Sequence, residues 1–336
     1  MPVEHINWKR VFSIAGLIIL LILLLRGCVY ACSKQPDTAE HDEPGAGRTV
    51  QVYVKETGKT VSMPVETYLE RVVAAEMPAS FHVEALKAQA VAARTYTYKR
   101  MADGGCTNGA QLCTDSTCCQ AYDSDEDCRK KWGSAYESNM KKIHTAVIET
   151  HGEVMEYNGA LIEALYHAAS GGQTEDSENV FAAARPYLRG VESENEVGSS
   201  HLRDEERMTR KEFAAAVNKQ WSKAGLKASS LEKQVEIEER FKSGRVETIR
   251  LGKVEATGRE LRGALELRSA WFTIEFTGDE VIINTRGYGH GVGMSQSGAN
   301  GMAQEGKDYR EILMHYYTGI QFENMEDAQT PIPKKA

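Results

Sequence analysis

The sequence predicts a globular α+β fold that follows one membrane-spanning helix at the N-terminus. Three observations carry this prediction. Apolar residues make up 41% of the 336 residues, which is enough for a packed core. Segments with helical spacing and segments with alternating polarity both recur between residues 49 and 325. They follow one another without the strand–helix–strand rhythm of a parallel sheet, so we expect helices and antiparallel hairpins around a cleft.

The first 31 residues have the pattern of a cytoplasmic stub and an anchor. Residues 11–25 carry no charge but are too short to cross a bilayer, so the predicted span is 11–31, with Arg26 near its far end. Lys9 and Arg10 would keep residues 1–10 in the cytoplasm and place the rest of the chain outside it.

Two alternatives to an uncleaved anchor remain open. Val29-Tyr30-Ala31 also fits a signal-peptide cleavage site, and Cys28 or Cys32 would suit a lipid modification less well, given Arg26 and Tyr30 nearby. In each case the remainder of the chain is extracytoplasmic. Residues 32–48 are polar and contain proline and glycine, which predicts a flexible linker, and residues 326–336 predict a disordered tail.

The globular part, residues 49–325, begins with a hairpin and two helices. Residues 50–54 alternate in polarity and turn at 57–59 into 60–63. Pro64 opens a helix that runs to about Ala75, and Pro78 excludes its continuation. An alanine-rich helix follows at 83–100.

The later elements are predicted from the same two periodicities. Helices are expected at 136–150, 209–224 and 311–317, and strands at 153–157 and 161–167. Two further hairpins are expected, one from 235–241 and 245–251 and the other from 272–276 and 281–285.

Glu76 is the one charged residue in the apolar run from Val72 to Phe81. Burial disfavours the ionised form of a carboxyl group, so such a residue can keep a proton near neutral pH and act as a general acid. The alternative is a solvated carboxylate at a helix end. Nearby Glu84 is explained by the first turn of its helix, where a carboxylate complements the dipole.

Two glycine-containing segments are further candidates for a binding site. In the first, Gly171-Gly172 follows a strand that supplies Tyr166, His167 and Ser170, although an ordinary glycine turn would look the same. The second, residues 287–306, places His290 between glycines.

Several functional classes are disfavoured. A net charge of −8 argues against a nucleic-acid binder. A nucleotide site is disfavoured because the glycines lack a βαβ context. A serine hydrolase is disfavoured because no G-x-S-x-G segment occurs.

Cysteines cluster at Cys106, Cys113, Cys118 and Cys119, with Cys128 close by. Four thiolates make a closed tetrahedral zinc site of structural type, which leaves no open position for a hydrolytic water. Disulfides are the main alternative outside the cytoplasm, and free thiols are the third. Adjacent Cys118 and Cys119 would not easily pair with each other.

Three blocks of the sequence resemble the stage II sporulation protein D family, the peptidoglycan lytic transglycosylases of endospore-forming bacteria, and more loosely the amidase-enhancer proteins. The blocks are MPVETYLERVVAAEMPASFHVEALKAQAVAARTYTY, YHAASGGQTEDSENVF and GYGHGVGMSQSGANGMAQEGKDYREILMHYYTG. The resemblance implies that Glu76 is the catalytic acid/base of a membrane-anchored enzyme. It implies as substrate glycan strands without stem peptides, cleaved between N-acetylmuramic acid and N-acetylglucosamine to leave 1,6-anhydro ends during engulfment.

The resemblance also implies partners and a metal. The partners would be a sporulation amidase like stage II sporulation protein P and a membrane protein like stage II sporulation protein M. Some relatives bind zinc through two histidines and two cysteines; here Cys118 stands in place of a histidine, and Cys106 lies one residue from the other. The alternative function is a non-catalytic glycan-binding enhancer of an amidase. The residues expected to contact glycan are Lys87, Gln89, Arg94, Tyr166, His167, Ser170, Gly171, Gly172, His290 and Gln296.

Overall fold

The computed structural model describes residues 48–325, apart from 107, 182, 194–195, 197–198 and 200–201. The predicted stub, anchor, tail and nearly all of the predicted linker lie outside the described residues. Within the described part of the chain, no helix has both the length and the apolar composition needed to cross a membrane.

The chain begins with the predicted hairpin, formed by strands β1 (Thr49–Val54) and β2 (Lys59–Pro64), which pair antiparallel. Helix α2 (Val65–Glu76) follows directly, with Pro64 at its N-cap. Met77 is extended, with φ −121° and ψ 143°, as expected for a residue before proline. The predicted helix end is therefore confirmed, and it places Glu76 in the last turn.

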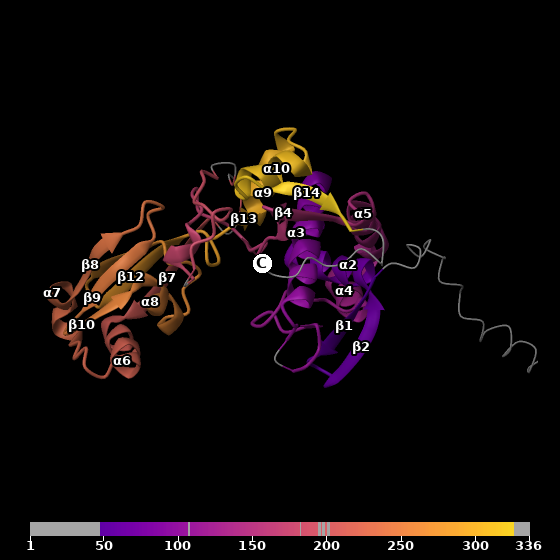
Figure 1. Cartoon of the computed structure of the whole chain (residues 1–336). Helices are drawn as coiled ribbons and strands as arrows, with labels where there is room; N and C mark the ends of the chain where they lie inside the picture. Colours follow the sequence, from indigo (N-terminus) through magenta and orange to yellow (C-terminus); the bar gives the residue numbers. More distant parts are fainter. Residues whose placement is uncertain are drawn as a thin grey trace, which may run out of the picture. The chain divides into compact units, whose positions relative to one another are not determined.

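Helix α3 (Val83–Ala102) is the central helix of the first core (Figure 1). Its alanines allow close approach, and it contacts α2, α5, β4, α9 and α10. These partners are α5 (Tyr136–Ile148), β4 (Glu153–Tyr157), α9 (Gln296–Gln304) and α10 (Tyr309–Tyr316). Segments far apart in the sequence thus meet around one helix.

A second core lies between residues 203 and 286 and contains Phe213, Ile249, Leu261 and Phe272. Two three-stranded antiparallel sheets form it, in the orders β10-β9-β8 and β11-β12-β7. The elements are β7 (Arg203–Thr209), α6 (Arg210–Gln220), α7 (Leu231–Gln234), β8 (Val235–Arg240), β9 (Val246–Leu251), β10 (Val254–Thr257), α8 (Gly258–Ala264), β11 (Phe272–Thr277) and β12 (Glu280–Arg286). Both predicted hairpins of this region are confirmed.

The structure differs from the sequence prediction at several short elements. The strand expected at 161–167 is two, β5 (Ala160–Leu161) and β6 (Tyr166–His167). Helix α4 (Asp125–Trp132) was not predicted; a capping box of Ser124 and Asp127 begins it. The remaining strands are β3 (Leu112–Cys113), parallel to β1, β13 (Met294–Ser295), parallel to β6, and β14 (Gln321–Asn324), antiparallel to β4. The α+β class is confirmed.

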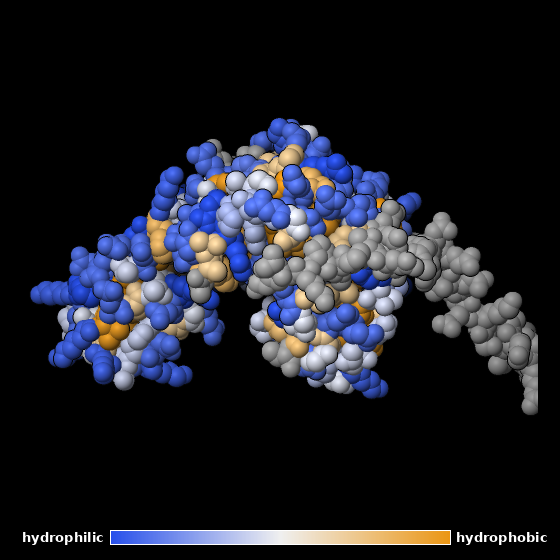
Figure 2. Space-filling view, in the orientation of Figure 1, coloured by the Kyte–Doolittle hydropathy of each residue, from blue (hydrophilic) through white to orange (hydrophobic). Residues whose placement is uncertain are grey.

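The surface of the described residues is mostly hydrophilic on the face drawn in Figure 2, where apolar residues form only small patches. Large apolar side chains are buried in the two cores, and the exposed exceptions among the described residues are Val61, Tyr288 and Met314. The chemistry of the site is therefore sought in polar groups within the fold.

Candidate active site

Glu76 lies in the last turn of α2, and donors from two other segments hold its carboxylate. The backbone N–H of Ala121 donates to Oε1 at 2.8 Å. Gln296 Nε2, on the first residue of α9, donates to Oε2 at 3.3 Å and also to Gln89 Oε1 at 3.3 Å. The structure thus brings together Gln89, Gln296 and Glu76, which lie far apart in the sequence.

Burial raises the pKa of Glu76 above its usual value. The hydrogen bonds from Ala121 and Gln296 act in the opposite direction, because they stabilise the carboxylate, but they do not cancel the effect of burial. The negative end of the α2 dipole also disfavours a carboxylate at this position. Glu76 is accordingly suited to hold a proton at a pH where an exposed carboxyl group has lost it.

Tyr166 completes this group of residues. Its hydroxyl donates to Gln120 Oε1 at 2.8 Å, and Gln120 Nε2 donates to Thr97 Oγ1 at 3.3 Å. Asp123, whose charge also raises the pKa of Glu76, forms an ion pair with Lys131 at 3.0 Å. Among the described residues, no second carboxylate shares a hydrogen-bond partner with Glu76. The site therefore has a single carboxyl group surrounded by neutral donors.

Lys87 and Arg94 lie outside this group. Lys87 forms ion pairs with Glu84 at 2.8 Å and with Glu149 at 2.7 Å. Arg94 is fully buried and forms an ion pair with Glu66 at 2.5 Å, and it also donates to the backbone oxygens of Val147 and Glu153. The prediction that Arg94 contacts glycan is wrong, because a guanidinium without solvent access and with its donors used inside the core cannot reach a ligand.

The glycine segment after β6 is tied to a residue that the sequence did not single out. Glu196 is 2% exposed, and its carboxylate accepts the N–H groups of Ser170 and Gly171, each at 2.8 Å. It also accepts the hydroxyl of Ser295, the N-cap of α9. Glu196 therefore links the glycine turn to the start of the helix that carries Gln296. Gly171 and Gly172 line a separate cavity of about 470 Å³.

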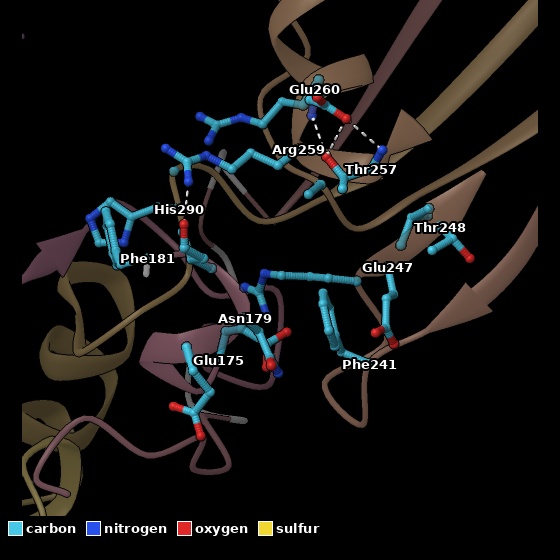
Figure 3. A pocket seen from close by; sticks show the side chains of 17 residues that line it. Glu175, Asn179, Phe181, Phe241, Glu247, Thr248, Thr257, Arg259, Glu260 and His290 are labelled. Carbon is cyan, nitrogen blue, oxygen red and sulfur yellow. Dashed lines mark hydrogen bonds between the residues drawn. The ribbon is translucent and has the colours of Figure 1, made fainter. Parts of the chain in front are cut away.

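His167 and His290 form a ring pair, with centroids 5.5 Å apart, on the other face of β6 from Tyr166. His290 lines a cavity of about 630 Å³, which we call the arginine cavity because Arg245, Arg259 and Arg262 also line it (Figure 3). Glu76 is not among its lining residues. Of the predicted glycan contacts, Gln89, Tyr166 and Gln296 thus lie with Glu76, whereas His290 lies at the arginine cavity.

Glycine is needed on both sides of His290 because a larger residue would clash with neighbouring side chains. Gly291 has φ +87°, and a Cβ there would lie 2.4 Å from the guanidinium carbon of Arg245. Gly289 has φ +115°, and a Cβ there would lie 2.8 Å from the Cβ of His167. The glycine run thus allows two buried side chains to pack against the backbone.

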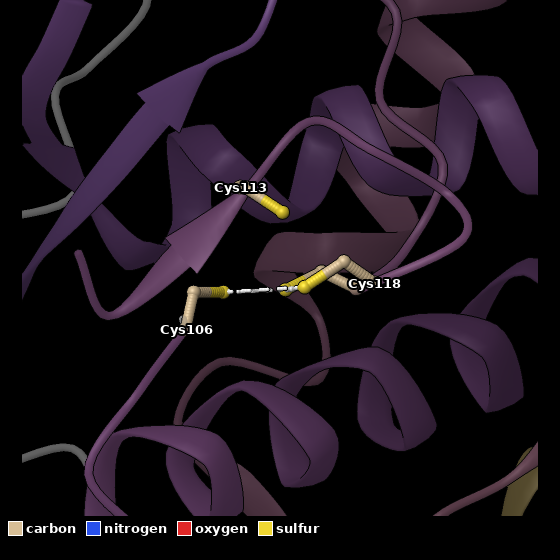
Figure 4. A group of neighbouring side chains, drawn as sticks. Cys106, Cys113 and Cys118 are labelled. Carbon is tan, nitrogen blue, oxygen red and sulfur yellow. Dashed lines mark hydrogen bonds between the residues drawn. The ribbon is translucent and has the colours of Figure 1, made fainter. Parts of the chain in front are cut away.

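The four clustered cysteines bring their sulfur atoms within 4.8 Å of one another (Figure 4). The Sγ–Sγ distances are 3.9 Å for Cys106–Cys118, 3.9 Å for Cys118–Cys119 and 2.9 Å for Cys106–Cys119. Four thiolates bound tetrahedrally at the roughly 2.3 Å of a zinc–sulfur bond lie about 3.8 Å apart. The donor set and its spacing therefore fit a metal ion, and all five described cysteines are free.

The cysteine loop leads directly into the site. Cys118 and Cys119 precede Gln120, which holds Tyr166, and Ala121, which donates to Glu76. Neither residue was among the predicted site residues. A backbone N–H has no signature in a sequence, so the contact of Ala121 had no detectable signal, whereas the adjacency of Gln120 to the cysteines was visible.

The sequence is also similar to several known proteins. A family profile described as "Stage II sporulation protein" matches residues 53–157. Stage II sporulation protein D of Bacillus subtilis (strain 168) is 37% identical over 81% of this chain and 78% of its own length. Stage II sporulation protein D of Bacillus amyloliquefaciens is 34% identical over 92% of this chain and 94% of its own. An amidase enhancer of B. subtilis is 29% identical over 75% of this chain and 39% of its own.

Proposed function

The chain belongs to the stage II sporulation protein D family, and on that premise we propose that it is a lytic transglycosylase acting on peptidoglycan strands without stem peptides. The observation that carries the proposal is the isolated, partly desolvated carboxyl group of Glu76, whose pKa is raised by burial. An ordinary glycosidase needs two carboxyl groups, one as acid and the other as base or nucleophile. A transglycosylase can use one group for both proton transfers.

In the proposed reaction, protonated Glu76 donates its proton to the glycosidic oxygen between N-acetylmuramic acid and N-acetylglucosamine. The bond from C1 to that oxygen breaks, and N-acetylglucosamine leaves with the proton. The Glu76 carboxylate then accepts the proton of the muramic acid C6 hydroxyl, whose oxygen bonds to C1. The product is a 1,6-anhydro sugar, and no water is consumed. Gln296 and the Ala121 N–H steady the carboxylate in its ionised stage.

We also propose that Cys106, Cys113, Cys118 and Cys119 hold a structural zinc ion. Thiolates suit zinc, and four of them close its coordination sphere. The ion would supply stability to the loop rather than chemistry, and it would fix Gln120 and Ala121 against Tyr166 and Glu76. Arg100 approaches Cys106 at 3.9 Å and favours its thiolate form.

The location and partners follow as further parts of the proposal. The apolar segment 11–31 would anchor the enzyme in the membrane with its folded part outside the cytoplasm. There it would act beside an amidase that removes stem peptides and beside a membrane partner. The name of the amidase-enhancer relative supports an association with an amidase. The same name favours a second candidate function, a glycan-binding protein that stimulates the amidase without cleaving glycan itself.

The test is digestion of amidase-treated sacculi by the full chain purified in detergent, with products identified by mass spectrometry. We expect anhydromuramoyl ends, each lighter by one water than a hydrolysis product. Glu76→Gln should lower their yield roughly a hundredfold or more, the usual contribution of a general acid. Asp123→Asn is the matched control and should retain activity, because that carboxylate is occupied by Lys131.

The two candidate functions give different results. A wild-type chain that yields no anhydro ends but accelerates the amidase would replace the enzyme proposal with the enhancer. Glu76→Gln with wild-type yield would exclude Glu76 as the acid.

A further inference from the structure

Three guanidinium groups border the arginine cavity, and none of them forms an ion pair with another described residue. Most of the other described arginines form ion pairs, for example Arg250 with Glu236 at 2.5 Å. Arg245, Arg259 and Arg262 instead donate to backbone oxygens. Three guanidinium groups thus share one space with the acidic side chains of its wall without forming an ion pair with any of them.

Arg245 is the most deeply buried of the three, with 2% exposure. Its two terminal nitrogens donate to the backbone oxygens of Gln173 and Ser170 at 2.9 and 2.8 Å, which leaves Nε without a partner. Burial lowers the pKa of Arg245 to about 10, so the side chain is still charged at neutral pH. Glu175 and Glu196 favour its charged form electrostatically, but neither forms an ion pair with it, and a bound anion would further reduce the cost of burying the charge.

Arg259 and Arg262 come from helix α8 and keep donors free for a ligand. Arg262 uses only Nε, which donates to the backbone oxygen of Leu267 at 3.1 Å. Arg259 donates through one terminal nitrogen to the backbone oxygen of Val180, as drawn in Figure 3. The free terminal nitrogens of both are suited to the two oxygens of a carboxylate.

Four acidic side chains line the same wall; none of them forms an ion pair with these arginines, and three have hydrogen-bond or ion-pair partners elsewhere. Glu178 forms an ion pair with Arg189, and Glu175 accepts from Ser243 and from Asn179 Nδ2. Glu260 accepts from Thr257 in the capping box of α8. Glu247 is the remaining acid, and it lies with Phe241 on the wall opposite Arg259 (Figure 3).

The rest of the wall suits a sugar. Phe181 lies with its ring 5.5 Å from that of His290 and 5.7 Å from the guanidinium of Arg259, and Phe241 lines the same space. Burial and the neighbouring Arg262 and Arg245 lower the pKa of His290 to about 4, so its ring is a neutral hydrogen-bonding group. Aromatic faces with a few fixed polar groups are typical of ligand sites of this volume.

We propose that the arginine cavity binds the free lactyl carboxylate of a muramic acid residue, and so recognises glycan from which the stem peptide has been removed. This inference rests on the proposed function, which makes such glycan the substrate. In intact peptidoglycan the lactyl group is an amide that joins the sugar to the peptide. Removal of the peptide converts it into a carboxylate, which is the chemical difference between the two kinds of strand. His167 follows Tyr166 in β6, and its ring lies 5.5 Å from that of His290, which lines the cavity.

The test measures binding of N-acetylmuramic acid to the full chain in detergent by isothermal titration calorimetry. Its lactyl amide, which keeps the sugar but loses the charge, should bind about tenfold more weakly or worse, because charge-assisted bonds to arginine are lost. Arg262→Gln should weaken binding of the acid to a similar extent, and Arg262→Lys should weaken it less. Arg250→Gln, on β9 and outside the cavity, is the matched control and should bind as the wild type does.

Arg259→Gln provides a second variant in case Arg262→Gln unfolds, since Arg259 is exposed. Equal binding of the acid and the amide would overturn the proposal, as would wild-type affinity in both glutamine variants. Inorganic phosphate that displaces the sugar acid at equal concentration would show a general anion site and overturn it too. Glu76→Gln should bind the sugar acid normally, so absence of cleavage with intact binding would refute only the proposed function.

Discussion

Glu76 is subject to two opposing influences, and their balance sets when it carries a proton. Burial at the end of α2 raises its pKa, while two hydrogen-bond donors, from Ala121 and Gln296, stabilise the carboxylate. A group with a strongly raised pKa would donate readily but accept poorly. A lytic transglycosylase must do both with one side chain, so an intermediate balance suits the proposed chemistry.

Gln296→Leu is expected to shift this balance in a defined direction. The amide donates to Glu76 Oε2, so its removal destabilises the carboxylate and raises the pKa of Glu76 further. The protonated form then persists to higher pH, so the alkaline limb of the rate–pH profile should shift to higher pH. The profile should be measured on peptide-free glycan by counting anhydro ends.

Gln304→Leu is the control for that experiment, because Gln304 is the exposed last residue of the same helix and should leave the limb in place. An alkaline limb that shifts to lower pH in Gln296→Leu would contradict the assigned hydrogen bond.

For single residues, the sequence indicates which side chains are unusual but not what surrounds them in the fold. Glu76 stood out because an acid is unusual in an apolar run, and the structure places Gln296 and Tyr166 beside it. Arg94 was misjudged because a polar residue in an apolar helix looks the same whether it faces a cleft or a buried partner. Only the position of Glu66 on the neighbouring helix distinguishes the two cases.

At the scale of elements, the Arg94–Glu66 pair fixes α3 against α2, and hence the frame that holds Glu76. Glu66→Gln should destabilise the fold by about 3–5 kcal/mol, because it leaves the guanidinium buried without a counter-charge. Urea denaturation gives the free energy of unfolding. Asp103→Asn, which breaks the more exposed pair with Lys99 on the same helix, should cost about 1 kcal/mol or less. Equal losses in the free energy of unfolding would show that the buried pair contributes no more to stability than the exposed one.

The cysteine loop provides a second prediction for an element. If the loop holds zinc and positions Ala121, Cys118→Ser should lower both the metal content per chain and the yield of anhydro ends. Metal analysis and product counting measure the two effects. Cys128→Ser is the control, since Cys128 is buried and free but not part of the cluster. A Cys118→Ser chain with unchanged metal content would contradict the assigned ligand.

Elements with strong local signals were predictable from the sequence, and those that depend on tertiary contacts were not. The hairpins and helices α2 and α3 follow from alternation, proline and alanine content. Helix α9 was missed because its glycines disfavour a helix; it is stabilised by the Ser295 cap and by packing on α3 and α10. The strand expected at 161–167 is interrupted because β6 pairs with β13, a partner distant in the sequence.

At the scale of the molecule, the chain builds a first core that still includes Leu188, builds a second core from Phe213 to Ile283, and returns to the first at Val292. The sequence predicts one globular stretch from 49 to 325, because no proline- or glycine-rich linker marks where the second core begins, and the glycine-rich segment after its end, 287–306, is interpreted as a candidate binding site. The arginine cavity takes residues from both regions: Phe181 and His290 from the flanking segments, and Arg245, Arg259 and Arg262 from the second core. In the proposed function, the second core thus contributes to substrate recognition and the first core carries the acid Glu76.

Two separate cores should open independently. Ile249 is fully buried in the second core and Leu86 in the first, so truncation of either to alanine should cost about 2–5 kcal/mol. Ile249→Ala should accelerate amide hydrogen exchange in peptides from 203–286 and leave α3 protected, whereas Leu86→Ala should do the reverse. Mass spectrometry of exchanged peptides resolves the two regions in the full chain. Uniform acceleration in both variants would instead mean that the cores unfold as one cooperative unit. In that case the second core, with its proposed ligand site, would depend for its stability on the core that carries Glu76.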